Sequence, residues 1–336
     1  CKNLKTWNPN IIIDFIANEN TLDVIKNNPY IDNLIVYKKS FSKDKLAFFK
    51  FLLSHYKKKY DYVIDAYGKL ESLLITIFSN SNKKIGYDKP YSRFFYNIPI
   101  KRQNFSENKL QLSIVHRIQL LEPIMGTSSK STDYPIYISN DEIGVFRKKF
   151  DKNLGGLKKP IMINAIGSSI EKTYPIEYMS KLIDHVFIVS SSPLILNYMP
   201  NQKRYVDDLI KKLNPKTQKA IKESLTPNSL RDLIISVSLC DAVIGNEGGA
   251  INIGKGLSKP TFAIFSPFID PLGWHTEKKH KTMAVHLKDY FHNELDIKHI
   301  KNIINDKKEV KKLYLKLTPN LFQKKLTGFL ENLNKQ

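Results

Sequence analysis

The chain has 336 residues, 42% of them hydrophobic and 25% charged, with 53 lysines and arginines against 32 aspartates and glutamates. This length predicts two domains of ordinary size, and the longest dense apolar run, residues 73–78, is too short for a membrane-spanning helix. The net charge of +21 favours acidic partners such as phosphates or anionic lipids. However, the lysines are dispersed and only six residues are arginines, so we expect a solvated basic surface and no nucleic-acid partner. With two cysteines, Cys1 and Cys240, a disulfide framework is excluded and a reducing compartment is expected.

Short apolar runs alternate with amphipathic stretches, which is typical of a parallel sheet covered by helices. In the first half of the chain the pattern predicts strands at 11–16, 34–37, 62–65 and 85–87, and helices at 21–27, 45–59, 71–78 and 110–125. Asparagine, glycine, lysine and proline then interrupt every periodicity at residues 153–160, which predicts a linker.

The second half repeats the alternation. It predicts strands at 161–165, 186–190, 242–245 and 261–265, and helices that begin near Pro175 and at 229–239 and 248–256. We therefore expect an α/β protein with Rossmann-like domains at 1–152 and 161–306, a cleft between them, and a lysine-rich helical tail at 307–336. In such domains ligands bind at the carboxyl ends of the strands, where helix N-termini supply backbone donors.

One candidate anion site follows the predicted strand that ends at Gly245. Gly248 and Gly249 stand where a helix begins, and glycines there let the backbone approach a phosphate closely. The alternative is a strand-to-helix turn that needs glycine only for tight packing.

A second candidate anion site follows the strand at 161–165. Ser168 and Ser169 offer hydroxyl donors and Lys172 an ammonium, a combination that suits a diphosphate. The alternative is a capped helix with a surface lysine. Because both candidate sites follow strands of one domain, we expect them to face one ligand.

Four blocks in this sequence together resemble one family. The blocks are Tyr60 to Gly68 with Ser72; the pair His116 and Arg117; Lys172 ahead of Tyr174 and Pro175; and Gly245 to Asn252 with Gly256, Pro260, Pro267 and Pro271. Their order resembles glycosyltransferase family 9, the lipopolysaccharide heptosyltransferases. The resemblance implies the GT-B arrangement of two Rossmann-like domains. It also implies metal-independent, inverting transfer of a sugar from a nucleotide diphosphate to a lipid-linked acceptor, with no cofactor.

The resemblance also implies roles for individual residues. The donor side would comprise Ser168, Ser169, Lys172, Glu223, Glu247, Gly248, Gly249 and Asn252, and the acceptor side Lys69, Ser72, His116 and Arg117. The family's Asp-Thr/Ser-Gly-x-x-His motif appears here with glutamate at Glu247 and an amide at Asn252. This departure leaves the donor sugar open.

The general base of the family lies in a Gly-Asp loop after its first strand. Residues 11–16 resemble the family's second strand. We therefore expect the first strand, the Gly-Asp loop and the base to lie upstream of Cys1. Within the chain, Asp14 and Asp65 are carboxylates at the corresponding end of the sheet, although an aspartate at a strand end is often a structural cap. The histidines and cysteines show no metal-binding spacing, and no Gly-x-Ser-x-Gly turn indicates a serine hydrolase.

These observations predict a glycosyltransferase that moves a heptose or related sugar onto a lipopolysaccharide or envelope-glycan acceptor. Its expected partners are a nucleotide sugar, the lipid-linked acceptor and an anionic membrane surface, with the protein in the cytoplasm on the inner face of the inner membrane. Two alternatives remain: a catalytically silent nucleotide-sugar-binding protein of the same fold, and a basic module that binds nucleic acid or membrane surfaces.

Overall fold

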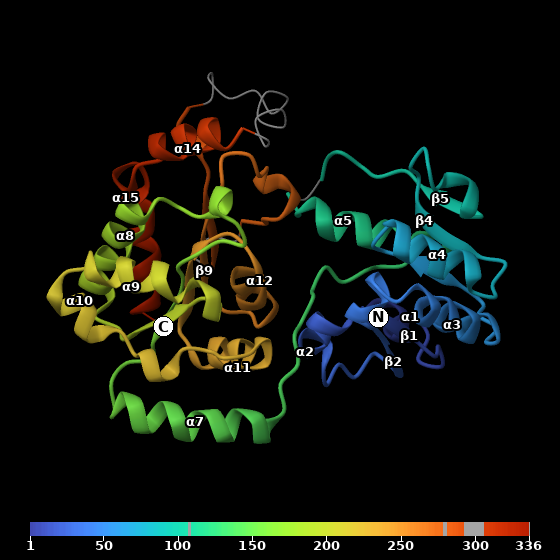
Figure 1. The fold of residues 1–336 in the computed structure, drawn as a ribbon, viewed down its shortest axis with the longest axis horizontal. Helices are drawn as coiled ribbons and strands as arrows, with labels where there is room; N and C mark the ends of the chain where they lie inside the picture. Colours follow the sequence, from blue (N-terminus) through green and yellow to red (C-terminus); the bar gives the residue numbers. More distant parts are fainter. Residues whose placement is uncertain (107–108, 278–280, 292–305, 336) are drawn as a thin grey trace. The chain divides into compact units, whose positions relative to one another are not determined.

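The computed structural model describes residues 1–106, 109–277, 281–291 and 306–335 (Figure 1). The chain forms two compact units. Unit 1 consists of Cys1–Leu22, Asn28–Asp133 and Leu272–Trp274, and unit 2 of Asp23–Asn27, Tyr134–Pro271 and the described residues of His275–Gln336. None of the helices in these described ranges has the length and apolar character that a membrane span requires.

Unit 1 contains two parallel sheets. Strands β1 (Asp14–Asn18) and β2 (Asn33–Tyr37) form one, and β3 (Val63–Asp65), β4 (Lys84–Tyr87) and β5 (Ile98–Ile100) form the other. The helices before Asp133 are α1 (Lys2–Trp7), α2 (Leu22–Ile25), α3 (Lys45–Tyr56), α4 (Leu70–Phe78), α5 (Leu112–Gln119) and α6 (Glu122–Met125).

The single helix predicted at 110–125 is two helices in the structure. The break falls at Pro123, in the first turn of α6, because proline lacks the N–H that would continue the hydrogen-bond ladder of α5. Proline is tolerated at this position because the first N–H groups of a helix have no partner inside it.

Unit 2 is built on one parallel sheet of strand order β10-β9-β8-β6-β7. Its strands are β6 (Ile161–Asn164), β7 (Leu194–Asn197), β8 (Ala242–Asn246), β9 (Thr261–Ile264) and β10 (Thr282–Val285). The helices are α7 (Asn140–Leu154), α8 (Ile176–Ser190), α9 (Lys203–Lys211), α10 (Pro215–Ala220), α11 (Leu230–Leu239), α12 (Gly249–Gly256), α14 (Lys307–Lys316) and α15 (Pro319–Leu333).

Both faces of this sheet are covered, as Figure 1 shows for α8 and α15 on one side and α11 and α12 on the other. Alternate residues of one strand enter different clusters: Ile161 and Ile163 pack with side chains of α8 and α15, whereas Met162 packs with those of α7, α11 and α12. Burial on both faces explains why the strands of unit 2 read as continuous apolar runs.

The strand predicted at 186–190 is wrong, because these residues form the last part of helix α8. A short buried apolar run has no distinguishing period, so strand and helix look alike in the sequence. The helix ends at Ser191, which takes a left-handed conformation with φ of 54°, and the strand β7 begins three residues later at Leu194.

The boundary between the units also differs from the predicted linker at 153–160. The structure places α7 in unit 2, because Phe150 and Leu154 are buried against its core. The residues expected as a tail from 307 onward are likewise part of this core. In α15, Phe322, Leu326, Phe329 and Leu330 are buried against α8 and the sheet. Residues 292–305 of the predicted second domain lie outside the described residues.

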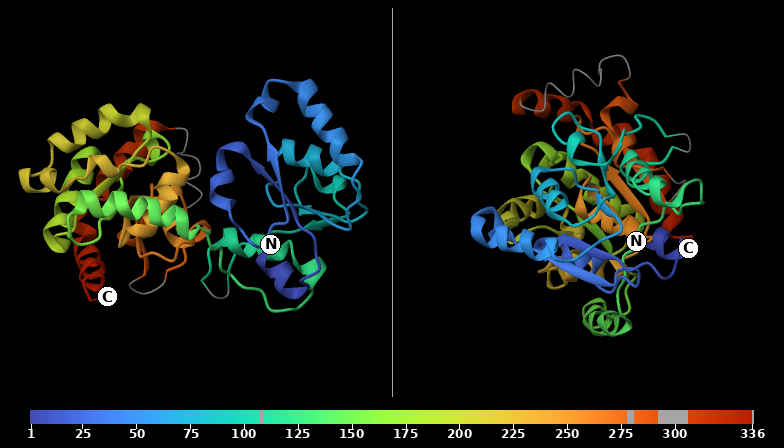
Figure 2. Two further views of the ribbon diagram at one scale, coloured as in Figure 1. Left: turned by 90° about the horizontal axis from the view of Figure 1, so that it is seen from below. Right: turned by 90° about the vertical axis from the view of Figure 1, so that its right-hand side faces the viewer.

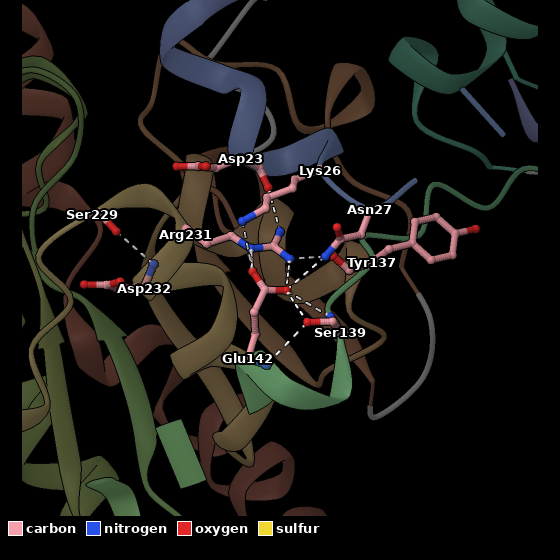
Figure 3. A network of polar contacts seen from close by, with 9 residues as sticks. All are labelled: Asp23, Lys26, Asn27, Tyr137, Ser139, Glu142, Ser229, Arg231 and Asp232. Atoms are coloured by element: carbon pink, nitrogen blue, oxygen red, sulfur yellow. Dashed lines mark hydrogen bonds and ion pairs between the residues drawn. The ribbon is translucent and has the colours of Figure 1, made fainter. Parts of the chain in front are cut away.

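A polar network holds the start of α11 in unit 2 (Figure 3). The guanidinium of Arg231 donates to both carboxylate oxygens of Glu142, over 2.8 and 2.7 Å, and also to the carbonyl oxygens of Asp23 and Tyr137. Ser139 donates to the same carboxylate from its backbone N–H and its hydroxyl. The Arg231 side chain is 9% exposed, so this arginine, one of six in the chain, is committed to the fold.

We predict that Arg231→Gln lowers the free energy of unfolding by about 3 kcal/mol, since it leaves a partly buried carboxylate without its cation. The hydrogen bonds from Arg231 hold the pKa of Glu142 well below its usual range. A lowered pKa means that this stabilisation is complete above the ordinary value of about 4.3 and fades as the pH falls below it. The difference between wild type and variant in urea unfolding should therefore shrink from pH 7 to pH 3.

The control is Arg147→Gln, which removes an exposed arginine from the same helix as Glu142. It should change stability by less than about 0.5 kcal/mol. A difference between wild type and Arg231→Gln that stayed constant down to pH 3 would show that the ion pair is not its source.

Candidate functional site

The sheet of unit 2 reverses its direction of growth between β6 and β8. From β6 the chain adds β7 on one side, then crosses over and adds β8, β9 and β10 on the other. In open parallel sheets ligands bind beyond the carboxyl ends of the strands at this reversal, because the loops that leave the two central strands diverge there. Both predicted donor loops follow these two strands, so the structure brings the two candidate anion sites to one edge.

Two buried asparagines join β6 and β8 at this edge. Asn164 and Asn246 are the last residues of the two strands, and each amide donates to the other's carbonyl oxygen, over 2.7 and 3.1 Å. Asn246 also donates to Ala165 O over 2.9 Å and accepts the backbone N–H of Tyr174 over 2.7 Å. Asn197, the last residue of β7, donates to the Asn164 side chain over 3.0 Å. The three amides therefore fix the paths of the loops that leave the sheet.

The sequence analysis missed these asparagines. Their signal was present in the sequence, since an asparagine ends three of the buried strands. An amide is suited to this position because it supplies both donors and acceptors to backbone groups that the sheet itself no longer pairs.

The glycines within and after β8 serve different purposes. A Cβ on Gly245 would lie 2.4 Å from the carbonyl oxygen of Asn164, so glycine is required there for close packing of the strands. Gly248 has a φ of +153°, which side-chain-bearing residues rarely adopt. A Cβ on Gly249, the first residue of α12, would meet nothing within 4 Å. Packing therefore does not require glycine at 249, and the backbone at the start of α12 is open to approach.

The loop after β6 is curled tightly on itself. The hydroxyl of Thr173 accepts the N–H of Gly167 over 3.1 Å and donates to the carbonyl oxygen of Ser169 over 2.8 Å. Ser168 and Ser169 lie exposed at its tip, and Lys172 ends a single 3-10 turn, η4 (Ile170–Lys172), half-buried. The tight curl holds two hydroxyls and one ammonium in a short segment.

The charged groups around the two loops act on one another. Burial raises the pKa of the half-buried Glu247, while the ammonium groups of Lys172 and Lys255 oppose that rise. Lys255, on α12, has its own pKa lowered to about 8 by burial, and Glu247 counteracts this shift. Glu247 thus lies within electrostatic range of Lys172 and of Lys255, a residue that the sequence analysis did not single out.

The remaining predicted donor residues are less closely grouped. Asn252 lies half-buried in the first turn of α12, where its N–H donates to Gly248 O. Glu223 is exposed at the start of a 3-10 turn. Ile221, two residues earlier, forms a β-bridge with Leu194, the first residue of β7, so this segment lies near the amino end of the strand and the candidate anion sites follow the carboxyl ends of β6 and β8. No contact among the described residues joins Glu223 to the others.

In unit 1 the carboxylate of Asp65 is saturated with hydrogen bonds. It accepts the N–H groups of Tyr67 and Gly68, the hydroxyl of Ser72 and the phenol of Tyr96, over 2.7–3.0 Å. Asp65 therefore shapes the turn between β3 and α4, and Ser72 is part of the same cap. Lys69, which precedes α4, lies over the ring of Tyr67.

Asp14, the other candidate base within the chain, is similarly occupied. Its carboxylate accepts Asn33 Nδ2, the ammonium of Lys58 and the phenol of Tyr60. Its side chain is 7% exposed, and these partners hold its pKa below its usual value against the effect of burial. A carboxylate held in its ionised form by three donors is a structural cap at the start of β1.

His116 and Arg117, on α5, lie with an arginine that the sequence analysis overlooked. The guanidinium of Arg102 stacks on the ring of Tyr87 at 3.9 Å, and His116 meets the same ring edge-on. Burial, with both arginines nearby, lowers the pKa of His116, so the imidazole is neutral at pH 7. Two of the chain's six arginines thus gather where β4 ends at Tyr87, beside β3 and its Asp65.

Comparisons with known proteins identify a family. The sequence profile of glycosyltransferase family 9 (heptosyltransferase) matches residues 49–293. Lipopolysaccharide heptosyltransferase 1 from Campylobacter coli is 24% identical over 277 residues, which cover 78% of this chain and 77% of that protein.

Solved structures are similar over almost the whole chain. ADP-heptose LPS heptosyltransferase II from E. coli has a TM-score of 0.68 at 17% identity and covers 98% of this chain and 93% of that one. A family 9 glycosyltransferase from Veillonella parvula has a TM-score of 0.72 at 18% identity, covering 94% and 91%. E. coli heptosyltransferase WaaC with ADP has a TM-score of 0.65 at 17% identity, covering 91% and 93%.

Two α/β units with parallel sheets, in a fold shared with these structures, confirm the predicted GT-B fold class. The profile covers more than half of the chain, so the chain belongs to glycosyltransferase family 9.

We predict that Asn246→Asp destabilises unit 2 by at least about 3 kcal/mol, since two buried donations become contacts between a carboxylate and carbonyl oxygens. Burial and the carbonyls would raise the pKa of the introduced carboxyl above its unfolded value. The destabilisation should therefore be smallest below about pH 4 and grow as the pH rises. Thermal unfolding between pH 3.5 and pH 7 measures this.

The matched control is Asn153→Asp, which makes the same change at the half-buried end of α7. The amide of Asn153 donates to the Lys149 carbonyl within one helix, so we expect a loss below about 1 kcal/mol. Equal losses in the two variants would contradict the role given to Asn246.

Proposed function

We propose that this protein transfers a heptose or related sugar from a nucleotide diphosphate to a lipopolysaccharide or envelope-glycan acceptor, with inversion and without a metal ion. The observation that carries the proposal is the edge of unit 2 where the loops after β6 and β8 leave adjacent strands: Lys172 lies on one loop, the open start of α12 follows the other, and Lys172 acts electrostatically on Glu247. Membership of family 9 and similarity to lipopolysaccharide heptosyltransferase 1 support the reaction class.

The donor's diphosphate would bind at this edge. Ser168 and Ser169 would donate hydroxyl hydrogens to phosphate oxygens, Lys172 would supply a positive charge, and the first N–H groups of α12 would complete the site. These same donors would stabilise the negative charge that gathers on the diphosphate as its bond to the anomeric carbon breaks. Glu247 and Asn252 would lie toward the sugar, where the departure from the family motif alters recognition.

Transfer requires a base that removes the proton of the attacking acceptor hydroxyl. The hydroxyl oxygen would attack the anomeric carbon from the face opposite the diphosphate, which inverts the configuration and releases the nucleoside diphosphate. Asp14 and Asp65 are held by hydrogen bonds within the fold, so neither carboxylate is assigned as this base.

The acceptor would meet the basic group of unit 1. Arg102, Arg117 and Lys69 offer positive charge near the ends of β3 and β4, and guanidinium groups suit phosphate or carboxylate groups on a lipid-linked glycan. The same acceptor would place the protein on the inner face of the inner membrane, in the cytoplasm, where the excess of lysines is attracted to anionic lipid.

We predict that the protein binds a nucleoside diphosphate and that Lys172→Ala weakens this binding about ten- to a hundredfold, the effect of losing one charge-assisted contact. Lys181→Ala, on the exposed side of α8, is the control and should leave the dissociation constant unchanged. Calorimetry with ADP and with UDP measures both variants. If the two variants bound equally well, Lys172 would not be a donor-site residue.

We predict sugar transfer to a heptose-deficient lipopolysaccharide acceptor from ADP-heptose or a related nucleotide sugar, detected by mass spectrometry, with the anomeric configuration read by NMR. Activity should persist in EDTA and fall at least tenfold in Arg102→Gln or Arg117→Gln. Nucleotide binding without transfer would favour the silent binding protein.

A further inference from the structure

Helix α3 of unit 1 carries apolar side chains on two faces. On the inner face Phe48 and Leu52 are buried, and they pack in a cluster with Phe41 and Ile75. The outer face presents a second set of apolar side chains to solvent: Leu46, Phe49, Leu53 and Tyr56 are 64%, 47%, 42% and 60% exposed. Both views of Figure 2 show this helix, residues 45–56, at the outer edge of unit 1.

The four exposed residues form one continuous stripe. At about 100° per residue they fall within an arc of roughly 80° on the surface of α3. Scattered exposed apolar residues are normal on a soluble protein, whereas four large side chains in one stripe mark an interaction surface. We call this set the outer stripe.

Lysines border the outer stripe. Lys45 lies on one side of it and Lys50 and Lys57 on the other, all exposed. Residues 43–59 contain six lysines, with Asp44 as the acidic residue among them. The carboxylate of Asp44 is engaged in capping α3, since it accepts the N–H of Ala47 over 2.9 Å. Lys58 pairs with Asp14, which leaves the other lysines to define the charge of this surface.

We propose that the outer stripe and its bordering lysines dock unit 1 on an anionic lipid bilayer. Apolar side chains would enter the boundary between headgroups and acyl chains, and the ammonium groups would lie among the lipid phosphates, as in helices that lie in a membrane interface. The proposal extends the membrane association put forward above by naming its surface, and it does not depend on the transfer chemistry.

Charge complementarity selects this occupant. A second copy of the chain would bring the same lysine borders together, and like charges across an interface are repulsive. The lysine-rich helices α14 and α15 each expose one large apolar side chain, Leu315 at 44% and Leu321 at 37%, while Phe322, Leu326 and Phe329 of α15 are buried in unit 2. The outer stripe differs because four exposed apolar side chains lie together on one helix between exposed lysines.

The test is co-sedimentation with vesicles of phosphatidylglycerol and phosphatidylethanolamine at 0.15 M salt, beside vesicles of phosphatidylcholine. We expect binding to the anionic vesicles alone, reduced at least tenfold by Phe49→Gln with Leu53→Gln. Val145→Gln with Ile188→Gln is the matched control, since both residues are exposed apolar side chains of helices in unit 2. The control should retain binding within about twofold.

A second pair of variants tests the position of the charge, because both variants lose three lysines and so have the same net charge. Changing Lys45, Lys50 and Lys57 together to Gln should reduce vesicle binding at least tenfold, whereas the same change at Lys148, Lys149 and Lys152 of α7 should not. Leu46→Trp, in a background with both native tryptophans replaced by Phe, should shift its fluorescence to the blue on anionic vesicles.

Equal losses in the test and control variants would overturn the proposal, because they indicate diffuse attraction. The absence of wild-type binding to anionic vesicles, or of a blue shift from Leu46→Trp, would overturn it too. So would binding of the outer stripe to an acidic protein with no affinity for vesicles. Calorimetry with ADP on the same variants separates this proposal from the proposed function, because the nucleotide-binding residues lie in unit 2.

Discussion

The two amides at the ends of β6 and β8 are the constraint on which the candidate site depends. Parallel strands end with backbone groups that the sheet no longer pairs, and here those groups are buried. Asn164 and Asn246 satisfy them reciprocally, and Asn246 also binds the backbone of Tyr174. The same bonds that satisfy the sheet therefore set the positions of Lys172 before Tyr174 and of Gly248 after Asn246. The same hydrogen bonds therefore stabilise the sheet edge and fix the geometry of the candidate site.

Tyr174, whose N–H binds Asn246, also contacts the C-terminal helices. The phenol of Tyr174 donates to the carbonyl oxygen of Leu317, between α14 and α15. Burial raises the pKa of the Tyr314 phenol, and the carboxylate of Glu247 adds to this rise. The segment between α14 and α15 thus binds Tyr174 of the loop after β6, and Tyr314 of α14 lies near Glu247 of the loop after β8. A lysine-rich ending to the sequence looks like a solvated tail, but its apolar residues at 322, 326, 329 and 330 complete one face of the sheet.

The sequence predicts the parts of this fold that have strong local signals. Strands β6, β8 and β9 follow from their apolar runs, and the start of α12 follows from the glycines at 248 and 249. The helix that ends at Ser190 looks like a strand in the sequence, because residues 186–189 are all apolar whether they are buried or, like Ile188, exposed. Arg102 and Lys255 could not be found from motifs, since what distinguishes them is proximity to Tyr87 and to Glu247, residues distant in sequence or on another element.

The sequence predicts helix α3 but does not predict which of its faces is buried. Its residues are apolar on two faces, so neither its composition nor its periodicity reveals which face the core takes. Only the fold distinguishes Phe48, buried against Phe41, from Phe49, left outside with its neighbours on the stripe. The number of lysines likewise predicts attraction to anionic surfaces but not which part of the protein would contact them. Exposed apolar area would decide the contact surface, because the attraction of lysines acts over a Debye length of about 8 Å in any orientation. Burial of a stripe requires one orientation.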